Sequence, residues 1–253
     1  MKFSAIAVIP VYNHPSTVNG MVQGVLRAGL PCILVDDGSN DECALVLDGL
    51  QIRHEQTVQL VRLQANQGKG GAIMAGLRLA LERGFSHAVQ IDADGQHAVE
   101  DIPHFVQTAS EHPEAMICGA PVYDASIPKG RLYGRYLTHV WVWINTLSLD
   151  IRDSMCGFRV YPLAATVAVL DSAELGKRME FDSEVLVRLH WRGVPFVTLP
   201  TRVTYPQDGL SHFKVWRDNV LISGMHARMF AGMLLRLPRL LGRKLFYGRA
   251  SAS

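Results

Sequence analysis

The stretch His87-Ala88-Val89-Gln90-Ile91-Asp92-Ala93-Asp94 joins an apolar run to two carboxylates one residue apart, and Gly95-Gln96-His97 follows at once. The apolar run predicts a buried strand, which places both aspartates at its carboxyl end. Carboxylates in this position can hold a divalent cation whose other ligands are water and phosphate oxygens. Asp and Gly also suit a solvated turn after a strand, so this stretch alone leaves both readings open.

Short apolar strands alternate with helical patterns through the first half of the chain. Strands are expected at residues 3–10, 32–35, 58–63, 88–91 and 115–118, and helices at 15–28, 41–50, 70–83 and 102–111. This alternation predicts an α/β fold with a mostly parallel sheet covered on both faces. Ligands bind such sheets at the carboxyl ends of the strands, where Tyr12-Asn13, Asp36-Asp37 and Asp92-Ala93-Asp94 fall.

Charge is distributed unevenly over the 253 residues, of which 48% are apolar and 19% charged. From Val220 onward there are six Lys or Arg residues and no acidic residue. The remaining 19 basic residues stand against all 23 acidic ones, so residues 1–219 carry about −4 and the tail carries the basic excess. This asymmetry favours an anionic surface as the partner of the tail and argues against a body that binds nucleic acid.

The four cysteines form no Cys-x-x-Cys pair, which favours buried thiols in a reducing, cytoplasmic compartment. The first ten residues lack a small-residue cleavage site, so they are expected to form a strand rather than a signal peptide. Without an uninterrupted apolar run of about 18 residues, no spanning helix is expected.

A glycine-rich segment, Asn66-Gln67-Gly68-Lys69-Gly70-Gly71-Ala72, precedes the third predicted helix. Glycines there would let the backbone approach a ligand, and Lys69 could add a point charge for phosphate at the helix N-terminus. The spacing matches neither a P-loop nor a dinucleotide-binding fingerprint. An ordinary glycine-rich start of a helix is the alternative.

Five segments in order resemble the motifs of family 2 glycosyltransferases. They are Pro10-Val11-Tyr12-Asn13, Val35-Asp36-Asp37-Gly38-Ser39, Gly68-Lys69-Gly70-Gly71-Ala72, Asp92-Ala93-Asp94-Gly95-Gln96-His97 and Asp153-Ser154-Met155-Cys156-Gly157-Phe158-Arg159-Val160-Tyr161. The last resembles the branch of dolichyl- and polyprenyl-phosphate sugar synthases. The resemblance covers about residues 5–215 and implies a GT-A fold with a mixed, mainly parallel sheet. It further implies a nucleotide-diphosphate sugar donor, Mg²⁺ or Mn²⁺, and inversion at the anomeric carbon.

The resemblance also implies roles for individual residues. Pro10, Tyr12 and Asn13 would line the nucleoside pocket, and Asp36 or Asp37 would accept hydrogen bonds from the base or ribose. Lys69 would lie near the nucleotide, Asp92 near the ribose and the metal, Asp94 on the metal, and Gln96 near the sugar or its phosphate. The chain departs from the family at His14, where Glu is frequent, and at Met155, which is inserted before Cys156-Gly157. The Q-x-x-R-W signature of processive polysaccharide synthases is absent, which argues against a polymer-extruding synthase.

The acceptor decides whether a general base is needed. A hydroxyl must lose a proton, and the candidate bases are Asp182 and Asp153, with a helix-capping role as the alternative for Asp182 on a helix expected at 175–188. A lipid phosphate is already anionic and needs cations to hold it. Arg131 and Arg135 lie one turn apart on a helix expected after residues 128–130, where a solvated helix face is the alternative. The resemblance implies the phosphate-binding role, because the lipid-phosphate branch carries arginines in this region, and Arg159 could join them. Residues 205–214 resemble a late loop of the same branch, which could close over the donor.

Two domains are expected, a GT-A glycosyltransferase domain at residues 1–219 and a basic amphipathic helical tail at 220–253. Pro238 should interrupt any helix in this tail. An amphipathic helix lying on an anionic membrane and a helix packed on the domain are both compatible with the pattern. The expected location is therefore cytoplasmic, including a peripheral position on the cytoplasmic face of a membrane.

The resulting expectation is a metal-dependent hexosyltransferase that moves a sugar from a nucleotide-diphosphate donor to a lipid-linked or polyprenyl-phosphate acceptor. The lipid-phosphate branch often carries two spanning helices that are not expected here, so a small hydroxyl acceptor stays open. A nucleotide-sugar-binding protein or a nucleotidyltransferase is the alternative from another class. The paired aspartates argue against the first, and Pro10-Val11-Tyr12-Asn13-His14 stands where the second would carry a glycine-rich, basic loop.

Overall fold

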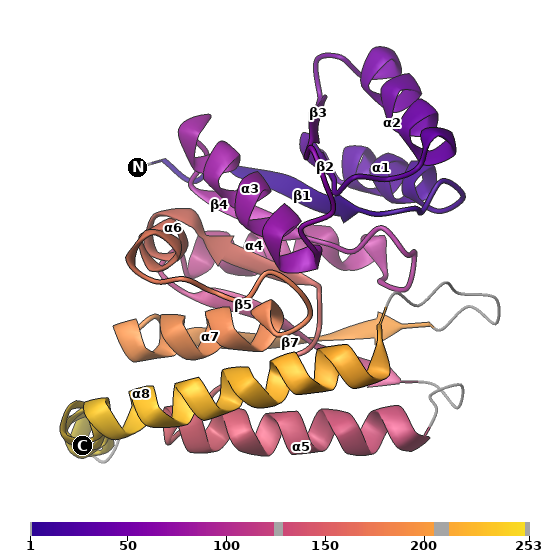
Figure 1. Ribbon diagram of the computed structural model, residues 1–253. Coiled ribbons are helices and arrows are strands. Elements are labelled where there is room, and N and C mark those ends of the chain that lie inside the picture. The colour runs from indigo at the N-terminus through magenta and orange to yellow at the C-terminus, as the bar shows by residue number, and fades with distance from the viewer. Residues whose placement is uncertain (1, 124–128, 205–212, 251–253) are drawn as a thin grey trace.

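A single seven-stranded sheet organises the part of the chain that the computed structural model describes, residues 2–123, 129–204 and 213–250 (Figure 1). The strands are β1 (Ala5–Val11), β2 (Cys32–Asp36), β3 (Val58–Arg62), β4 (His87–Gln90), β5 (Met116–Tyr123), β6 (Arg159–Pro162) and β7 (Phe196–Val203). Their spatial order is β3-β2-β1-β4-β6-β5-β7. Only β6 runs antiparallel to its neighbours, so the sheet is mixed and mainly parallel, as the sequence predicts.

Helices cover both faces of the sheet. They are α1 (Val18–Arg27), α2 (Asp41–Arg53), α3 (Lys69–Glu82), α4 (Ile102–Glu111), α5 (Lys129–Thr146), α6 (Leu163–Ser172), α7 (Phe181–Arg192) and α8 (Val215–Ala250), and a short 3₁₀ turn, η1 (Val99–Asp101), precedes α4. The pleat of β1 shows how one strand serves two cores: Ile6 and Val8 face α3, whereas Ala7 and Ile9 face α1 and α4. Because both faces of β1 are buried, its sequence is continuously apolar and does not alternate between apolar and polar residues.

Local signals place most helix boundaries. The side chain of Asn40 accepts a hydrogen bond from the Cys43 N–H at 3.0 Å and begins α2, and Gly193 in a left-handed conformation (φ +88°) ends α7. The helix expected at 175–188 instead begins at Phe181, because the preceding segment, residues 173–180, packs against the start of α3. Strands β6 and β7 were not predicted.

The part of the chain expected to form a tail packs against the rest of the molecule. Helix α8 begins at Val215 and buries Met225, Met229, Met233 and Leu240 in the same core cluster as α3, α6 and α7. Figure 1 shows α8 and α5 side by side, and the two helices are in contact. The prediction that Pro238 interrupts the helix was wrong, because α8 continues through it with a change of direction near the C-terminus. A proline removes one backbone hydrogen bond, and a bend at an exposed position accommodates its ring.

Helix α8 also qualifies, over Val215–Lys244, as long and apolar enough to cross a membrane by length and composition alone. It is the one such helix among the described residues, and 22% of its most apolar window is buried. The sequence argument expected no spanning helix because it required about 18 apolar residues without interruption. That requirement was too strict, since α8 is apolar enough on average with polar residues in between.

The four cysteines are free and buried, as expected. Burial raises the pKa of the thiols of Cys32, Cys118 and Cys156 to about 12, so they are protonated and unreactive at neutral pH.

Candidate active site

Three parallel strands bring their carboxyl ends to one edge of the sheet. In the register, Val11 of β1 lies opposite Asp36 of β2, and Val8 of β1 lies opposite Gln90 of β4. The segments that follow these strands carry Tyr12, the aspartate pair of β2, and Asp92 with Asp94. The sheet thus gathers the polar clusters predicted from sequence at one edge.

A lysine bridges two carboxylates at this edge. The Lys69 ammonium lies 2.8 Å from Asp92 Oδ2 and 3.0 Å from Asp182 Oδ2. The side chains of Lys69, Asp92 and Asp182 are 18%, 19% and 8% exposed, so the three charges are largely shielded from water. Burial alone would lower the pKa of Lys69, but the two carboxylates outweigh it and raise that pKa well above its usual value. Lys69 therefore orients Asp92 and Asp182 toward each other.

Gly157 lies against the Asp92 carboxylate. A Cβ atom built at Gly157 would overlap the Asp92 carboxylate, so only glycine leaves room for that side chain. The same segment is tied to Asp153, whose Oδ1 accepts hydrogen bonds from the N–H groups of Met155 and Cys156 at 2.9 and 2.7 Å. The stretch 153–157 thus forms one wall of the site.

Asp94 lies beside Asp92 with a different environment. Its Oδ1 accepts a hydrogen bond from the Gln96 N–H at 3.0 Å. Burial and the negative charge of Asp92 raise the pKa of Asp94 above its usual value. For Asp92, burial acts in the same direction, but the Lys69 ammonium and then His97 outweigh it and lower the pKa well below the usual range.

These residues fit a divalent cation. Asp92 Oδ1 is buried and has no hydrogen-bond partner, which leaves it available as a ligand. Asp92, Asp94 and Asp182 carry three formal negative charges against two positive charges, on Lys69 and on Arg159, whose Nη1 lies 3.6 Å from Asp182 Oδ1, so a negative excess remains for a cation. Among the described residues no three His, Cys, Asp or Glu side chains gather around one point, so oxygens of water and of a diphosphate would have to complete the shell.

Asp36, the last residue of β2, and Asp37 are engaged with donors of the protein itself. Asp36 accepts from the Ser39 N–H and from Arg62 Nε at 2.9 and 3.0 Å. Asp37 accepts from the N–H groups of Gln67 and Gly68 at 2.7 and 2.8 Å. All four carboxylate oxygens therefore have protein donors, and contacts to a base or ribose would use their remaining lone pairs.

The glycine-rich segment before α3 approaches another loop rather than open space. A Cβ atom at Gly68, which has φ +96°, would meet the Lys177 carbonyl oxygen at 2.6 Å. The Gly71 N–H donates to the same carbonyl at 2.9 Å. This packing against residues 176–181 brings Lys69 within reach of Asp182, so the glycines act through the protein itself.

Asn13 joins two of the loops at this edge. It adopts φ +55°, its N–H donates to Ser39 Oγ at 3.1 Å, and its Oδ1 accepts from the Asn40 N–H at 2.8 Å. Pro10 lies within β1, and Tyr12 follows directly after the strand. The predicted nucleoside pocket is thus built from connected loops, while its contacts to a nucleoside stay predictions.

The two candidate bases, Asp153 and Asp182, lie in different surroundings. Asp153 accepts a bidentate pair from Arg135 at 2.6 and 2.7 Å, and His139 Nε2 lies 3.3 Å from its Oδ2. Although burial would raise the pKa of Asp153, the hydrogen bond from His139 and the charge of Arg135 lower it well below the usual range. Asp182 makes no helix-capping hydrogen bond among the described residues, and its Oδ1, which has no hydrogen-bond partner, lies 3.6 Å from the Arg159 guanidinium.

The three predicted phosphate-binding arginines differ in position. Arg135 on α5 is held by Asp153, with its side chain 15% exposed. Arg159 is fully buried, and donates to the Asp182 carbonyl at 2.7 Å and the Ser154 carbonyl at 2.9 Å, so its placement speaks against a contact with an acceptor phosphate. The side chain of Arg131 and the loop residues 205–212 lie outside the described part.

Sequence reasoning missed three contributors to the site. His97 Nε2 lies 3.7 Å from Asp92 Oδ2, and its Nδ1 is buried without a partner. Gly157 accommodates Asp92, and Lys177 positions the start of α3 through its carbonyl. His97 and Gly157 lie within segments that resemble family motifs, so the sequence did mark their neighbourhood. Nothing in the sequence around Lys177 indicated a role at this site.

A mixed, mainly parallel sheet with paired carboxylates at its carboxyl edge is the arrangement expected of a GT-A glycosyltransferase. The model of Glycosyl transferase family 2 matches residues 6–163, and the chain belongs to this family.

Curated relatives carry names from one branch of the family. A UDP-N-acetylglucosamine–dolichyl-phosphate N-acetylglucosaminyltransferase of Methanococcus voltae is 28% identical, covering 77% of this chain and 85% of its own. A polyprenol monophosphomannose synthase of Mycolicibacterium smegmatis is 26% identical, covering 81% and 79%.

Solved structures support the fold. A glucosyl-3-phosphoglycerate synthase of Mycobacterium tuberculosis, crystallised with Mn²⁺, UDP-glucose and phosphoglyceric acid, has a TM-score of 0.61 over 92% of this chain and 79% of that one, at 14% identity. TarS of S. aureus in complex with UDP has a TM-score of 0.60 over 99% and 73%, at 15% identity.

Proposed function

We propose that this glycosyltransferase depends on a divalent cation and transfers a sugar from a nucleotide-diphosphate donor to a lipid-linked phosphate, with inversion at the anomeric carbon. The observation that carries the proposal is the cluster of Asp92, Lys69 and Asp182 beside Asp94 at the carboxyl edge. The names of relatives that act on dolichyl or polyprenol phosphate support the acceptor class.

The donor would bind where the segments after β1, β2 and β4 converge. Asp92 Oδ1 and the Asp94 carboxylate would hold Mg²⁺ or Mn²⁺, which when bound neutralises the charge that builds on the leaving diphosphate. Lys69 fixes Asp92 from one side and Gly157 leaves space for it on the other, so the carboxylate is oriented before the donor arrives. Gln96, half-buried after Asp94, would contact the sugar or its phosphate.

The acceptor phosphate would lie near Arg135. The bidentate ion pair with Asp153 holds the Arg135 guanidinium in one orientation and leaves part of it exposed. A phosphate oxygen is already anionic near neutral pH and can attack the anomeric carbon without a general base. The saturated hydrogen bonding of Asp153 supports such a mechanism, because this residue would hold the arginine instead of accepting a proton.

A hydroxyl acceptor is the second candidate, and Asp182 favours it. The Asp182 side chain is 8% exposed, its Oδ2 lies 3.0 Å from Lys69, and its Oδ1, 3.6 Å from Arg159 Nη1, has no hydrogen-bond partner. A base at this position would accept the hydroxyl proton as the bond to the sugar forms. Replacing Asp182 by Asn would stop transfer to a hydroxyl and would leave transfer to a phosphate much less affected, which separates the two candidates.

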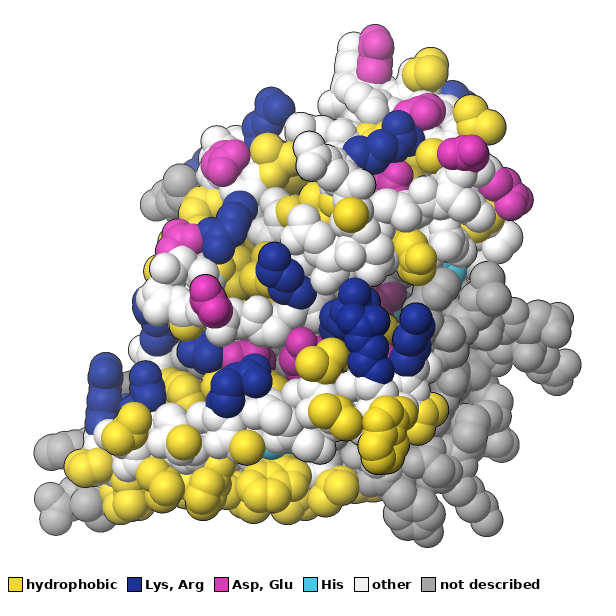
Figure 2. All heavy atoms as spheres, in the orientation of Figure 1, with side chains coloured by type: hydrophobic (Ala, Val, Ile, Leu, Met, Phe, Trp, Pro, Cys, Tyr) yellow, Lys and Arg dark blue, Asp and Glu magenta, His cyan; other side chains and the backbone are white. Residues whose placement is uncertain are grey.

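The exposed apolar faces of α5 and α8 support a position at a membrane surface. On α5, Leu137 and Trp141 are exposed, and on α8, Trp216, Leu234 and Leu235 are exposed. The lower edge of Figure 2 is a row of such apolar side chains. A peripheral location on the cytoplasmic face of a membrane would bring the site to a lipid-linked acceptor.

Asp94→Ala tests the donor proposal. In wild type, a matching nucleotide from a panel of UDP, GDP and dTDP with Mn²⁺ should raise the melting temperature, since a ligand that binds the folded state stabilises it. The variant should lose this shift and at least 10²-fold in nucleotide release with polyprenyl phosphate and the matching sugar donor, a loss of about 3 kcal/mol in transition-state stabilisation. Glu55→Ala, an exposed carboxylate remote from the edge, is the matched control.

Metal-dependent nucleotide binding by the Asp94 variant at the wild-type level would refute the cation site. The stereochemical part of the proposal has its own test, because proton NMR of the product reports inversion or retention at the anomeric carbon.

A further inference from the structure

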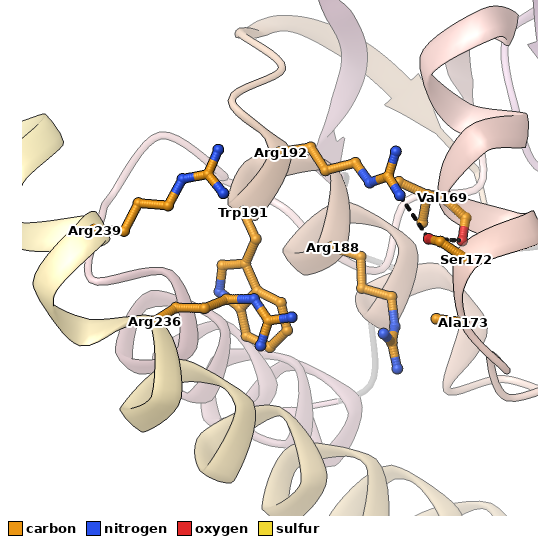
Figure 3. Close-up of a pocket in the computed structure, with 8 residues that line it drawn as sticks. All are labelled: Val169, Ser172, Ala173, Arg188, Trp191, Arg192, Arg236 and Arg239. Atoms are coloured by element: carbon orange, nitrogen blue, oxygen red, sulfur yellow. Dashed lines mark hydrogen bonds between the residues drawn. The ribbon is translucent and has the colours of Figure 1, made fainter.

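A groove lined by arginines lies where the C-terminal parts of α6 and α7 meet α8. Figure 3 shows its walls, and its volume is about 550 Å³. The lining residues are Val169, Ser172, Ala173, Arg188, Trp191, Arg192, Arg236 and Arg239. Four of them are arginines and none is acidic, so the groove concentrates positive charge.

Three of the four guanidinium groups have no acidic partner among the described residues. Arg188 is the exception, because it donates twice to the buried Glu184 carboxylate, at 2.9 and 2.7 Å. Arg192 donates to Ser172 Oγ at 2.6 Å, and Arg236 donates to the Gly232 carbonyl at 2.9 Å. No hydrogen bond or ion pair joins Arg239 to the described chain. Like charges gathered in this way repel one another unless an anion joins them.

The groove is organised before any ligand arrives. The Trp191 indole is 6% exposed, and its N–H donates to the Asn145 carbonyl at 2.8 Å, which fixes the ring. The Arg236 guanidinium stacks on that ring at 4.6 Å from its centroid. The hydroxyl of Ser172 orients Arg192 from the opposite wall. Guanidinium groups held in place lose less conformational freedom when they bind an anion.

The groove is separate from the donor edge. Asp182 stands in the first turn of α7 and Arg192 at its end, about 15 Å further along the helix axis at 1.5 Å per residue. In Figure 1, α7 extends from the middle of the molecule to its left side. A ligand in the groove therefore cannot be the donor diphosphate or the phosphate near Arg135.

The structure assigns to this groove, formed by Arg192, Arg236 and Arg239 around Trp191, the binding of a phosphate group. Guanidinium groups pair with phosphate through two parallel hydrogen bonds, and a groove open to solvent admits a phosphate ester. The exposed Leu234, Leu235 and Leu241 of the same helix adjoin the arginines, and Figure 2 shows Lys and Arg side chains above the apolar row. The phosphate of a lipid headgroup and that of a soluble ester share this chemistry.

Two probes distinguish these sources. Calorimetry with glycerol 1-phosphate at constant ionic strength measures binding of a soluble ester. Flotation with vesicles of phosphatidylglycerol in phosphatidylcholine, compared with pure phosphatidylcholine, measures binding of a lipid phosphate. We expect wild type to bind at least one probe. Preference for phosphatidylglycerol vesicles would identify the lipid source, and binding of glycerol 1-phosphate alone would identify the soluble one.

Charge reversal supplies the decisive comparison. Arg192→Glu/Arg239→Glu should weaken binding by tenfold or more, since a charge-assisted pair becomes a repulsion. Arg53→Glu/Arg83→Glu, two exposed arginines outside the groove, changes the net charge equally and should retain binding within about twofold. The single variant Arg239→Ser, which loses no contact within the described chain, guards against misfolding and should also weaken binding. Failure of both probes to bind, or an equal loss in both double variants, would overturn the site. Asp94→Ala should leave this binding intact, so the result is independent of the donor proposal.

Discussion

At the scale of single residues, the site depends on contacts that join distant parts of the chain. Lys69, Asp92 and Asp182 come from three elements and form one buried network of charges. Removing Lys69 would leave both carboxylates without their shared cation, and breaking a buried ion pair in this way costs about 3–5 kcal/mol. The network therefore links the stability of the fold to the position of Asp92.

Gly157→Ala should impair donor binding more than folding. The added methyl group would overlap the Asp92 carboxylate and force it away from Lys69 and from the cation. We expect the affinity for nucleotide with Mn²⁺, measured by calorimetry, to fall at least tenfold, which corresponds to about 1.4 kcal/mol. Gly20→Ala on α1, where a Cβ atom meets nothing within 4 Å, is the control. Unchanged affinity in the Gly157 variant would show that Asp92 need not occupy this position.

Asp153 should make the free energy of unfolding depend on pH in the acidic range. Burial opposes ionisation, but the hydrogen bond from His139 and the charge of Arg135 leave the folded pKa below the unfolded value. A lowered carboxyl pKa stabilises the fold above the unfolded pKa of about 3.9, and this contribution is lost as pH falls through the folded value. The difference in unfolding free energy between wild type and Asp153→Asn should therefore shrink by about 1 kcal/mol from about pH 7 to about pH 3. Urea titrations at both values measure it, and a constant difference would contradict the shifted pKa.

At the scale of elements, α8 has two apolar faces with different roles. Met225 is fully buried against the domain, whereas Leu235 is 84% exposed. Its inner face explains why the helix packs on the domain, and its outer face, together with that of α5, is available to a membrane surface. The two expectations drawn from the tail are thus compatible within one helix.

Substitutions on the two faces of α8 should separate stability from membrane binding. Met225→Ala should lower the free energy of unfolding by about 2–5 kcal/mol, because it leaves a cavity in the core. Leu235→Ala should change it by less than about 0.5 kcal/mol and should reduce vesicle flotation. Urea denaturation and flotation of both variants measure the two effects. Equal stability of the two variants would mean that α8 does not pack on the domain in solution.

At the scale of the whole molecule, the packing of α8 predicts that residues 1–219 do not form an independent domain. Together Met225, Met229, Met233 and Leu240 cover α5 and α7. A chain ending at residue 219 should therefore expose apolar surface, bind the dye ANS and melt at a lower temperature or precipitate. A chain ending at residue 244 keeps these four side chains and should melt like wild type. Cooperative melting of the shorter chain at the wild-type temperature would restore the boundary expected near residue 219.

Local pattern determined much of this protein. Alternating apolar periods identified β1 to β5 and α1 to α4, and the order of the motifs identified the family that the comparison with known sequences confirms. These signals are readable because strand and helix periods, and residues that follow a strand, lie within a few positions of one another. Paired aspartates after an apolar run likewise marked the edge of the sheet that carries the candidate site.

Only the tertiary structure decided which residues face one another. The antiparallel insertion of β6 between β4 and β5, the reach of Lys69 to Asp182 and the burial of Arg159 all join segments far apart in the chain. The arginine groove likewise requires α7 and α8 to pack against the end of α6. These contacts between distant segments depend on how the elements pack and on short-range interactions between charged groups. The spacing of residues along the chain does not predict them.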